Sequence, residues 1–392
     1  MKPGYKQTEV GVIPVEWDAL AAREIGVFRG GNGFPLEAQG ARSGDYPFFK
    51  VSDMNNEGNE TFMTTANHWI SEHTRKSLGA TAFPADAIVF AKVGAAIFLE
   101  RKKILGQASC IDNNMAALVL DRSRADVRFV HTQLLSKKLG SLVATTALPA
   151  LNGKQLDAMA LALPPLPEQR AIATALSDVD GLLGGLDRLI AKKRDLKQAA
   201  MQQLLTGQTR LPGFHGEWEV KRLGDVASVS KGNQLHSSET DDGGKFAHLN
   251  GGITPSSYTH KSNTDGNTIA ISEGGNSCGF VQFMTEPYWC GGHCYSVIPN
   301  GVDNLFLYHA LKGQQSAIMG LRVGSGLPNV QKTSLLDFKI ELPATLPEQT
   351  AIATVLTELD GELAVLEQRR EKTRALKQAM MQELLTGQTR LV

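Results

Sequence analysis

The sequence predicts an α+β protein in which two globular domains are separated by two long coiled-coil helices, in a cyclic pseudo-two-fold arrangement. Two 45-residue blocks, 166–210 and 346–390, are identical at 28 positions at a fixed offset of 180. Apolar residues recur inside both blocks at helical spacing. The segments outside the blocks are richer in Gly, Asn, Ser and Thr and carry short β-branched runs. These three observations together favour alternating globular and helical regions.

Each repeated block predicts one long helix. Pro167 and Pro347 lie where a first-turn proline is tolerated, and a glutamate follows each of them at the positive end of the helix dipole. Gly207 and Gly387 are C-terminal stop signals. About 38 helical residues at a rise of 1.5 Å per residue give a rod of roughly 57 Å.

Apolar side chains in both blocks alternate at steps of four and three residues, which is typical of a coiled-coil seam. The predicted seam consists of Ile172, Leu176, Val179, Leu183, Leu186, Ile190, Ile352, Leu356, Leu359, Leu363 and Leu366. The alternative is two amphipathic helices lying on separate cores. Gly181, Gly184 and Gly185 inside the first helix each cost about 1 kcal/mol relative to alanine. They either permit close approach of a partner helix or mark a break.

The start of the chain resembles the segment that follows the first block. Glu16-Trp17-Asp18 and Gly31-Asn32 recur as Glu217-Trp218-Glu219 and Gly232-Asn233, at an offset of 201. The chain order is therefore cyclic, and we expect the termini to lie near one another. The predicted regions are a first globular domain over 1–165, a first helix over 166–207, a second globular domain over 208–345 and a second helix over 346–392.

Within the globular regions, strand patterns are expected at 86–94, 115–120, 267–275 and 294–298, and shorter helices at about 129–142 and 304–319. The two regions are not close copies of each other. This divergence suggests the same task performed on different targets.

The charge balance excludes a protein that coats nucleic acid through a large positive charge. Lys plus Arg and Asp plus Glu both number 40, so the formal net charge is zero. Residues 29–163 carry 15 basic against 12 acidic side chains, and residues 231–343 carry 7 against 9. No apolar stretch has the length of a membrane span or a signal peptide, and four cysteines do not make a disulfide framework. We expect a cytoplasmic protein without membrane contact.

Catalytic and metal-binding motifs are missing from the sequence. An amino-methyltransferase would need Asn/Asp-Pro-Pro-aromatic, but the single Pro-Pro pair, Pro164-Pro165, has neither flank, and no phosphate loop is present. Asp86 and Lys92 lack the second acidic partner of a nuclease. Cys290-Gly-Gly-His293-Cys294, with Cys278 upstream, is not a strong zinc pattern and favours buried thiols. We therefore predict no catalytic residue, no metal and no cofactor on this chain.

Sequence-specific DNA binding needs only a few polar side chains directed at base edges. Polar residues beside glycine turns are the candidate base readers: Asn32, Lys50, Lys92, Asn233, Asn250, Ser272, Glu273 and Asn276. The candidate phosphate contacts are Lys50, Lys92, Arg101, Lys102 and Lys103. For each of these residues, a role in a turn, a strand end or a solvated face is the alternative.

The chain resembles the DNA-specificity subunit of type I restriction-modification enzymes. The resemblance rests on the Leu-Pro…Glu-Gln stretches at 163–169 and 342–349, each opening a helix that ends in Leu-Leu-Thr-Gly. It also rests on Tyr5-Lys-Gln-Thr with Gly11-Val-Ile-Pro, on Trp17 and Trp218, and on Asp86 with Lys92-Val-Gly. These motifs are distributed over essentially the whole chain.

This resemblance implies a division of labour. The two variable regions would be target-recognition domains that each contact one half of a split double-stranded DNA site. The two shared helices would pack antiparallel and set the distance between the half-sites. Methylation and ATP-dependent cleavage would belong to modification and restriction subunits, which would bind S-adenosylmethionine, ATP and Mg²⁺. Residues 167–205 and 347–385 would help dock two modification subunits. The alternatives are a methyltransferase in its own right, a coiled-coil assembly scaffold without DNA contact, and the specificity subunit of a related modification-nuclease system of another type.

Overall fold

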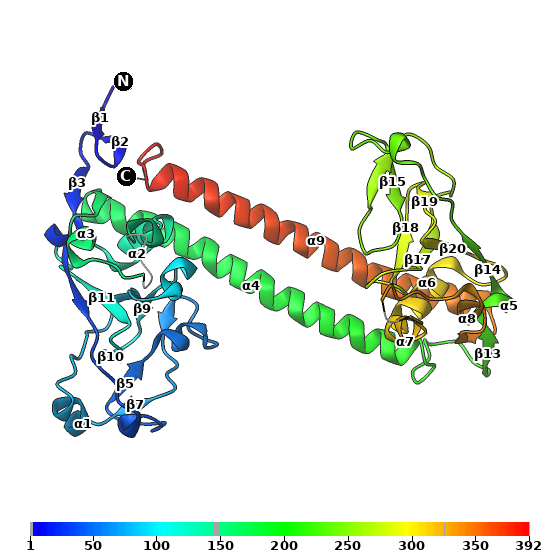
Figure 1. The fold of residues 1–392 in the computed structure, drawn as a ribbon, viewed down its shortest axis with the longest axis horizontal. Coiled ribbons are helices and arrows are strands. Elements are labelled where there is room, and N and C mark those ends of the chain that lie inside the picture. Colours follow the sequence, from blue (N-terminus) through cyan, green and yellow to red (C-terminus); the bar gives the residue numbers. More distant parts are fainter. Residues whose placement is uncertain (1–2, 144–148, 325, 392) are drawn as a thin grey trace. The chain divides into compact units, whose positions relative to one another are not determined.

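The computed structural model describes residues 3–143, 149–324 and 326–391, and the chain divides into two compact units (Figure 1). Unit 1 comprises Met1–Gly184 and Glu371–Val392, and unit 2 comprises Gly185–Arg370. Helix α4 (Leu166–Leu204) and helix α9 (Leu346–Leu384) contribute residues to both units. Each unit thus contains one globular domain and a segment of each long helix.

The domain of unit 1 is built on a five-stranded sheet and a three-stranded sheet. The larger sheet has the order β4 (Gly26–Gly30), β11 (Met115–Leu120), β8 (Ile88–Ala91), β9 (Lys102–Leu105) and β6 (Phe62–Met63). The smaller sheet has the order β10 (Cys110–Ile111), β5 (Tyr46–Phe49) and β7 (Trp69–Ile70). Two-stranded sheets pair β1 (Tyr5–Thr8) with β2 (Gly11–Pro14) and β3 (Asp18–Ala21) with β12 (Ala160–Leu163). The helices of the domain are α1 (Glu72–Ser77), α2 (Val127–Ser136) and α3 (Gly153–Asp157).

The domain of unit 2 repeats this plan. Its four-stranded sheet has the order β14 (Ala227–Lys231), β20 (Cys294–Pro299), β17 (Thr268–Ser272) and β18 (Val281–Met284). Its three-stranded sheet has the order β16 (Ser257–Thr259), β15 (Phe246–Leu249) and β19 (Trp289–Cys290), and β13 (Trp218–Arg222) pairs with β21 (Lys339–Pro343). The helices are α5 (Leu223–Val226), α6 (Asn304–Gly313), α7 (Gln315–Gly320) and α8 (Lys332–Leu336). The parallel pair of β5 with β10 in unit 1 recurs as β15 with β19 in unit 2, and unit 1 has a further parallel pair, β6 with β9.

Both long helices help to form the hydrophobic core of each unit. In unit 1, Ile172 and Leu176 near the start of α4 share a buried cluster with Leu384 at the end of α9. In unit 2, Leu204 at the end of α4 shares a cluster with Ile352 and Leu356 near the start of α9. The first members of the predicted seam therefore also belong to the domain cores, where each fully buried side chain contributes about 1.5–3 kcal/mol.

The remaining seam residues lie along the middle of the two helices. Leu186, Ile190 and Leu363 are buried, and Val179, Leu183, Leu359 and Leu366 are half-buried. Within unit 2, Lys193 pairs with Glu362 and Lys197 pairs with Asp360, and within unit 1 Asp180 pairs with Lys377. Because the residue number on α9 falls as that on α4 rises, the helices run antiparallel in each unit. The predicted α+β class with paired antiparallel helices is confirmed.

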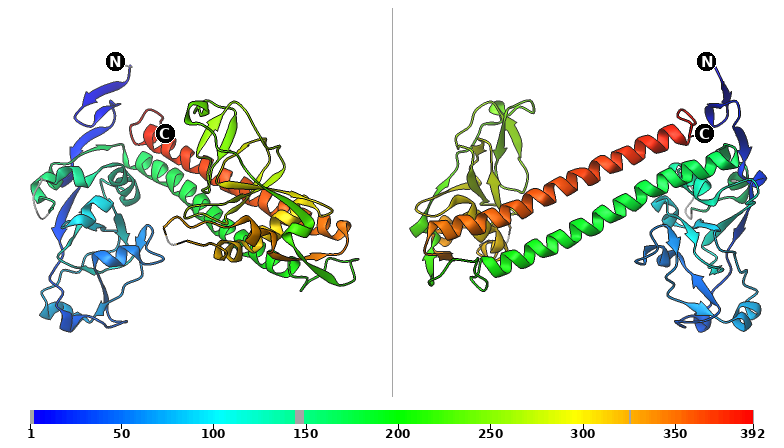
Figure 2. Two further views of the ribbon diagram at one scale, coloured as in Figure 1. Left: turned by 45° about the vertical axis from the view of Figure 1, so that its right-hand side comes forward. Right: turned by 180° about the vertical axis from the view of Figure 1, so that it is seen from behind.

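The repeated glutamate after Pro167 and Pro347 joins distant parts of each unit. Glu168 is buried; it accepts a hydrogen bond from Trp17 Nε1 at 3.0 Å and pairs with Arg390. In unit 2, Glu348 is equally buried and pairs with Arg210. The pair with Arg390 joins the C-terminal segment to the start of α4, and Tyr5 Oη donates to Gly387 O at 2.9 Å, so the described segments that contain Tyr5 and Gly387 lie side by side (Figure 2).

The helical glycines do not break α4, and Gly181 and Gly185 accommodate no closely packed neighbour among the described residues. The helix continues through Gly181, Gly184 and Gly185, and a Cβ atom built at Gly181 or Gly185 would meet nothing within 4 Å among the described residues. Gly361 occupies the position of α9 that corresponds to Gly181 and is equally open.

We expect Gly181→Ala and Gly361→Ala each to stabilise the protein by about 1 kcal/mol, because alanine loses less backbone entropy in a helix. The measurement is the midpoint of thermal unfolding. Gly207→Ala is the control, since Gly207 has φ +67° and its Cβ would lie 3.3 Å from the Trp218 ring. It should lower the midpoint; a decrease for all three variants would contradict the prediction.

In the described ranges, none of the helices combines the length and the apolar character needed to cross a bilayer.

Candidate nucleic-acid interface

The two domains hold corresponding loops with the same backbone hydrogen bonds. Three such bonds in unit 1 run from Gly31 N to Met115 O, from Lys92 N to Asn114 O and from Asp112 N to Phe49 O. Their counterparts in unit 2 run from Gly232 N to Cys294 O, from Glu273 N to His293 O and from Gly291 N to Leu249 O. These bonds, with the matching strand orders, make the loops structurally equivalent.

This equivalence defines two sets of corresponding residues. Loop cluster 1 consists of Gly30, Asn32, Lys50, Lys92 and Asn114; loop cluster 2 consists, in the same order, of Lys231, Asn233, Asn250, Glu273 and His293. Three predicted residues of each domain therefore fall at matching positions.

A glycine at the centre of each cluster is required by close backbone packing. A Cβ at Gly31 would overlap the carbonyl oxygens of Ile111 and Asp112, and one at Gly232 would overlap that of Cys290. Only glycine permits this approach of two chain segments. The glycine of the repeated Gly-Asn pair is thus explained by the same close backbone packing in both domains and not by contact with a ligand.

Loop cluster 2 borders an open cleft of about 600 Å³. The polar side chains that line it are Lys231, Asn250, Glu273, Asn276, Ser277, His293 and Asn329. Ser272 lies at the base of this region, buried, with Oγ accepting a hydrogen bond from Gly252 N at 3.0 Å. Asn233 is exposed and not part of the lining. The structure therefore brings three predicted residues together and adds Lys231, His293 and Asn329.

The carboxylate of Glu273 is surrounded by the polar groups of Lys231, Tyr295 and His293. Its Oε1 lies 2.6 Å from Lys231 Nζ and accepts a hydrogen bond from Tyr295 Oη at 3.0 Å. His293 Nδ1 lies 3.5 Å from the other carboxylate oxygen. Burial and the neighbouring carboxylate raise the pKa of the Tyr295 hydroxyl, which keeps it a donor. The arrangement presents cationic and amide groups to the cleft and keeps the carboxylate inside.

Loop cluster 1 has the same backbone and different chemistry. Lys92 Nζ lies over Gly30, and Lys92 makes no ion pair with a described residue. Lys50 Nζ donates to Gln39 Oε1 at 3.2 Å. Burial raises the pKa of the nearby Asp112, opposed by hydrogen bonds from Asn114 and by the charge of Lys50. Loop cluster 1 therefore has two ammonium groups, of Lys50 and Lys92, at the positions where loop cluster 2 has the amide of Asn250 and the inward carboxylate of Glu273.

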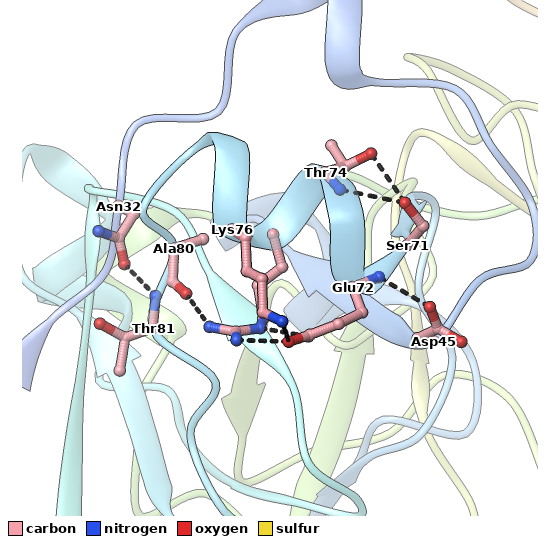
Figure 3. A network of polar contacts seen from close by, with 9 residues as sticks. Asn32, Asp45, Ser71, Glu72, Thr74, Lys76, Ala80 and Thr81 are labelled. Carbon is pink, nitrogen blue, oxygen red and sulfur yellow. Dashed lines mark hydrogen bonds and ion pairs between the residues drawn. The ribbon is translucent and has the colours of Figure 1, made fainter.

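Asn32 has a structural role in unit 1. Its side-chain oxygen accepts from Thr81 N at 2.9 Å (Figure 3). Its side-chain amide nitrogen donates to Gly79 O at 3.2 Å. Both ends of the side chain are thereby used to hold the segment after α1. The turn role that the sequence left open for Asn32 is the one its contacts support.

The three basic residues at 101–103 do not belong to loop cluster 1, because Lys102 and Lys103 lie on β9 and Arg101 precedes it. Lys102 is fully buried, pairs with Glu100 at 2.5 Å and donates to Lys137 O at 2.8 Å. A phosphate contact is incompatible with that burial, so Lys102 is withdrawn as a candidate. Lys103 donates to Glu60 O, and burial lowers the pKa of its ammonium group. Arg101 is half-buried.

The thiols of the Cys290–Cys294 motif lie in the interior. Both belong to a buried cluster with Leu249 and Tyr288, and Cys290 Sγ donates to Cys294 O at 3.4 Å. His293 between them is directed to Glu273 instead. The two cysteines of the motif therefore pack in the interior, and the histidine between them lines the cleft.

Comparisons with known proteins agree on one family. A model described as the type I restriction modification DNA specificity domain matches residues 14–190 and 215–374. A putative type I specificity subunit of Mycoplasma pneumoniae is 33% identical over 175 residues, which is 44% of this chain and 46% of that protein. The putative MjaX specificity subunit of Methanocaldococcus jannaschii is 24% identical over 99% of this chain and 97% of its own length. The match to a second Mycoplasma relative, from M. genitalium, likewise covers only 45% of that protein.

Solved structures share the fold. The crystal structure of a type I restriction-modification S subunit from M. genitalium matches with a TM-score of 0.70 at 19% identity, covering 98% of this chain and 99% of that one. A chain from a study of complex assembly in a type I system matches with a TM-score of 0.56 at 16% identity, covering 96% and 99%. With the family model spanning both domains, these findings lead to one conclusion. The chain belongs to the type I restriction-modification DNA specificity family.

Proposed function

We propose that this chain is the DNA-recognition subunit of a type I restriction-modification complex and that it recognises an asymmetric, bipartite double-stranded site. The observation that carries the proposal is the relation between the two loop clusters. They share one backbone frame, which favours the same kind of ligand, but they differ in side chains at four of five positions, which favours two different half-sites.

The two reactions of the complex, methyl transfer and DNA cleavage, would belong to partner subunits. Since the sequence offers no catalytic motif, methyl transfer and ATP-dependent cleavage would take place on modification and restriction subunits, with S-adenosylmethionine, ATP and Mg²⁺ bound there. The duplicated helical blocks provide each unit with matching surface residues, which supports docking of two modification subunits, one per unit. The complex would then act in the cytoplasm on cellular DNA.

The decisive experiment is methylome sequencing of a strain that expresses this chain with its modification partner. We expect a split, asymmetric methylation motif. A short palindromic motif would refute the proposal, and an assembled complex whose DNA association is absent or insensitive to salt would favour the scaffold alternative.

Variants in the two clusters should act on separate halves of that motif. Lys50→Ala in unit 1 should relax or weaken positions in one half-site only, and Asn276→Ala in unit 2 should do so in the other half-site only, by about tenfold for a lost base contact. Lys76→Ala, at an exposed position of α1, is the control and should leave the motif unchanged. A change in both halves from one variant would contradict independent recognition.

A further inference from the structure

We infer that both loop clusters present an ammonium group from the same pair of equivalent positions, 30 and 92 in unit 1 and 231 and 273 in unit 2, and that this group donates to the O6 and N7 acceptors of a guanine. In unit 1 the group is Lys92 Nζ; in unit 2 it is Lys231 Nζ, with Glu273 as its positioning residue. The inference rests on the proposed function and specifies a base in each half-site.

In unit 1 the ammonium group comes from the end of β8. Lys92 follows that strand and extends over Gly30, the last residue of β4, so closely that a Cβ atom on Gly30 would overlap Nζ. The end of the Lys92 side chain therefore occupies the space that a side chain at position 30 would fill. The two positions are coupled, because a side chain at position 30 would displace the end of the Lys92 side chain from this place.

In unit 2 the lysine occupies the other of the two equivalent positions. Lys231 is the last residue of β14 and corresponds to Gly30, while Glu273 follows β17 and corresponds to Lys92. The Lys231 side chain is 50% exposed and that of Glu273 is 12% exposed, with 2.6 Å between Nζ and Oε1. The carboxylate therefore lies inside and the ammonium group faces the cleft.

Glu273 is placed to hold Lys231 and not to contact a base itself. Its Oε1 already accepts from Lys231 and Tyr295, and Oε2 is buried without a hydrogen-bond partner among the described residues, with His293 Nδ1 at 3.5 Å. Lys231 retains donor hydrogens after its bond to Glu273, because an ammonium group has three. Lysine is therefore the group that can reach a ligand, and Glu273 fixes where it points.

A base edge fits this arrangement better than a phosphate. In unit 2, a phosphate contact would depend on net positive charge, which the carboxylate paired with Lys231 cancels, whereas a base contact depends on where the donor is held. The other polar groups of the cleft include the amides of Asn250, Asn276 and Asn329, the side-chain type that contacts base edges. Guanine alone presents two acceptors together in the major groove, which matches a cationic donor.

The test uses the full complex and reads the methylation motif of each variant. The wild-type motif should contain a G·C pair in both half-sites. Lys231→Gly should relax that pair in one half-site by about tenfold or more, and Lys231→Arg should retain it, since arginine also donates to guanine. Glu273→Gln should weaken the preference without abolishing it, because the lysine remains but is no longer held by charge.

The decisive variant is the double substitution Lys231→Gly with Glu273→Lys, which reproduces the arrangement of unit 1. It should regain the guanine preference that Lys231→Gly loses, although it contains no Lys–Glu pair; recovery therefore cannot come from a restored ion pair. The matched reciprocal variant, Gly30→Lys with Lys92→Glu, should keep guanine in the other half-site, while Gly30→Lys alone should lose it. The melting midpoint of each variant complex should be measured as a control, and it should stay close to that of the wild type if the complex remains folded.

The outcomes separate the two hypotheses. A split wild-type motif combined with no recovery in the double variant overturns this inference and leaves the proposed function intact. A uniform loss of affinity for all sequences in Lys231→Gly indicates a phosphate contact and also overturns it. A wild-type motif that is not split overturns the proposed function itself.

Discussion

Replacing Arg390 by alanine is expected to cost about 3–5 kcal/mol in the free energy of unfolding of unit 1, because it leaves a buried carboxylate without its cation. Arg390 binds Glu168 through both Nε and an Nη atom, and the Glu168 side chain is 0% exposed. The indole of Trp17 would remain as the one hydrogen-bond donor to this carboxylate among the side chains that the structure describes. A neutral donor does not compensate a buried charge.

The measurement is denaturant unfolding of the purified chain, followed by tryptophan fluorescence. Arg374→Ala is the matched control, since Arg374 lies on α9 and pairs with Glu371 at the surface. An exposed pair of this kind contributes about 0–1 kcal/mol. Equal small effects of the two variants would show that the Glu168 pair does not hold the C-terminal segment.

The corresponding change in unit 2 extends the prediction. Arg210 binds Glu348, which is 2% exposed at its side chain, and Trp218 Nε1 has no hydrogen-bond partner in the described part of the chain. Glu348 therefore lacks the indole donor that Glu168 has. We expect Arg210→Ala to be at least as destabilising as Arg390→Ala, in the same fluorescence measurement.

The local patterns of the sequence were sufficient for the main elements of the fold. The long helices begin at Leu166 and Leu346, directly before the two first-turn prolines, and end at Leu204 and Leu384, just before the Thr-Gly stops, because caps and apolar spacing act over a few residues. The strand patterns at 115–120 and 267–275 correspond to β11 and β17 for the same reason. The division into two units, each with parts of both long helices, depends on contacts across nearly the whole chain.

The candidate site was less predictable because side-chain partners lie far apart in sequence. The amide of Asn32 is occupied by backbone groups 47 and 49 residues away, which no local pattern reveals. Lys102 was predictable in principle: adjacent strand residues face opposite sides of a sheet, so a basic run on β9 cannot be exposed throughout. Lys231 was predictable too, since it precedes the repeated Gly-Asn pair and corresponds to Gly30.

Replacing Gln169 by alanine should destabilise unit 1 by about 3 kcal/mol or more, because three backbone groups lose their partner at once. Its side-chain oxygen accepts from Asp126 N at 2.7 Å, and its amide donates to Arg124 O at 3.0 Å and Pro164 O at 2.9 Å. Gln169 is 0% exposed, and each buried polar group left unsatisfied costs about 1–3 kcal/mol.

Gln349 gives an internal comparison for this prediction. It accepts from Asp303 N at 2.9 Å and donates to Pro343 O at 2.8 Å, two contacts instead of three. Gln349→Ala should therefore destabilise its own unit less than Gln169→Ala does, while Gln203→Ala, on the exposed face of α4, should change stability by less than about 0.5 kcal/mol. The reverse order of the two buried glutamines in denaturant unfolding would contradict the reasoning.

Because of where these two glutamines lie, their replacement by alanine should also affect function. Asp126 and Asp303 are the N-caps of α2 and α6, so each glutamine fastens a domain helix to the first turn of a long helix. Weakening that attachment should loosen the domain on its helix while the base-contacting loops keep their side chains. We therefore expect Gln169→Ala and Gln349→Ala to lower the extent of methylation at the wild-type motif without changing which bases are recognised, which methylome sequencing distinguishes from the relaxed motifs of loop-cluster variants.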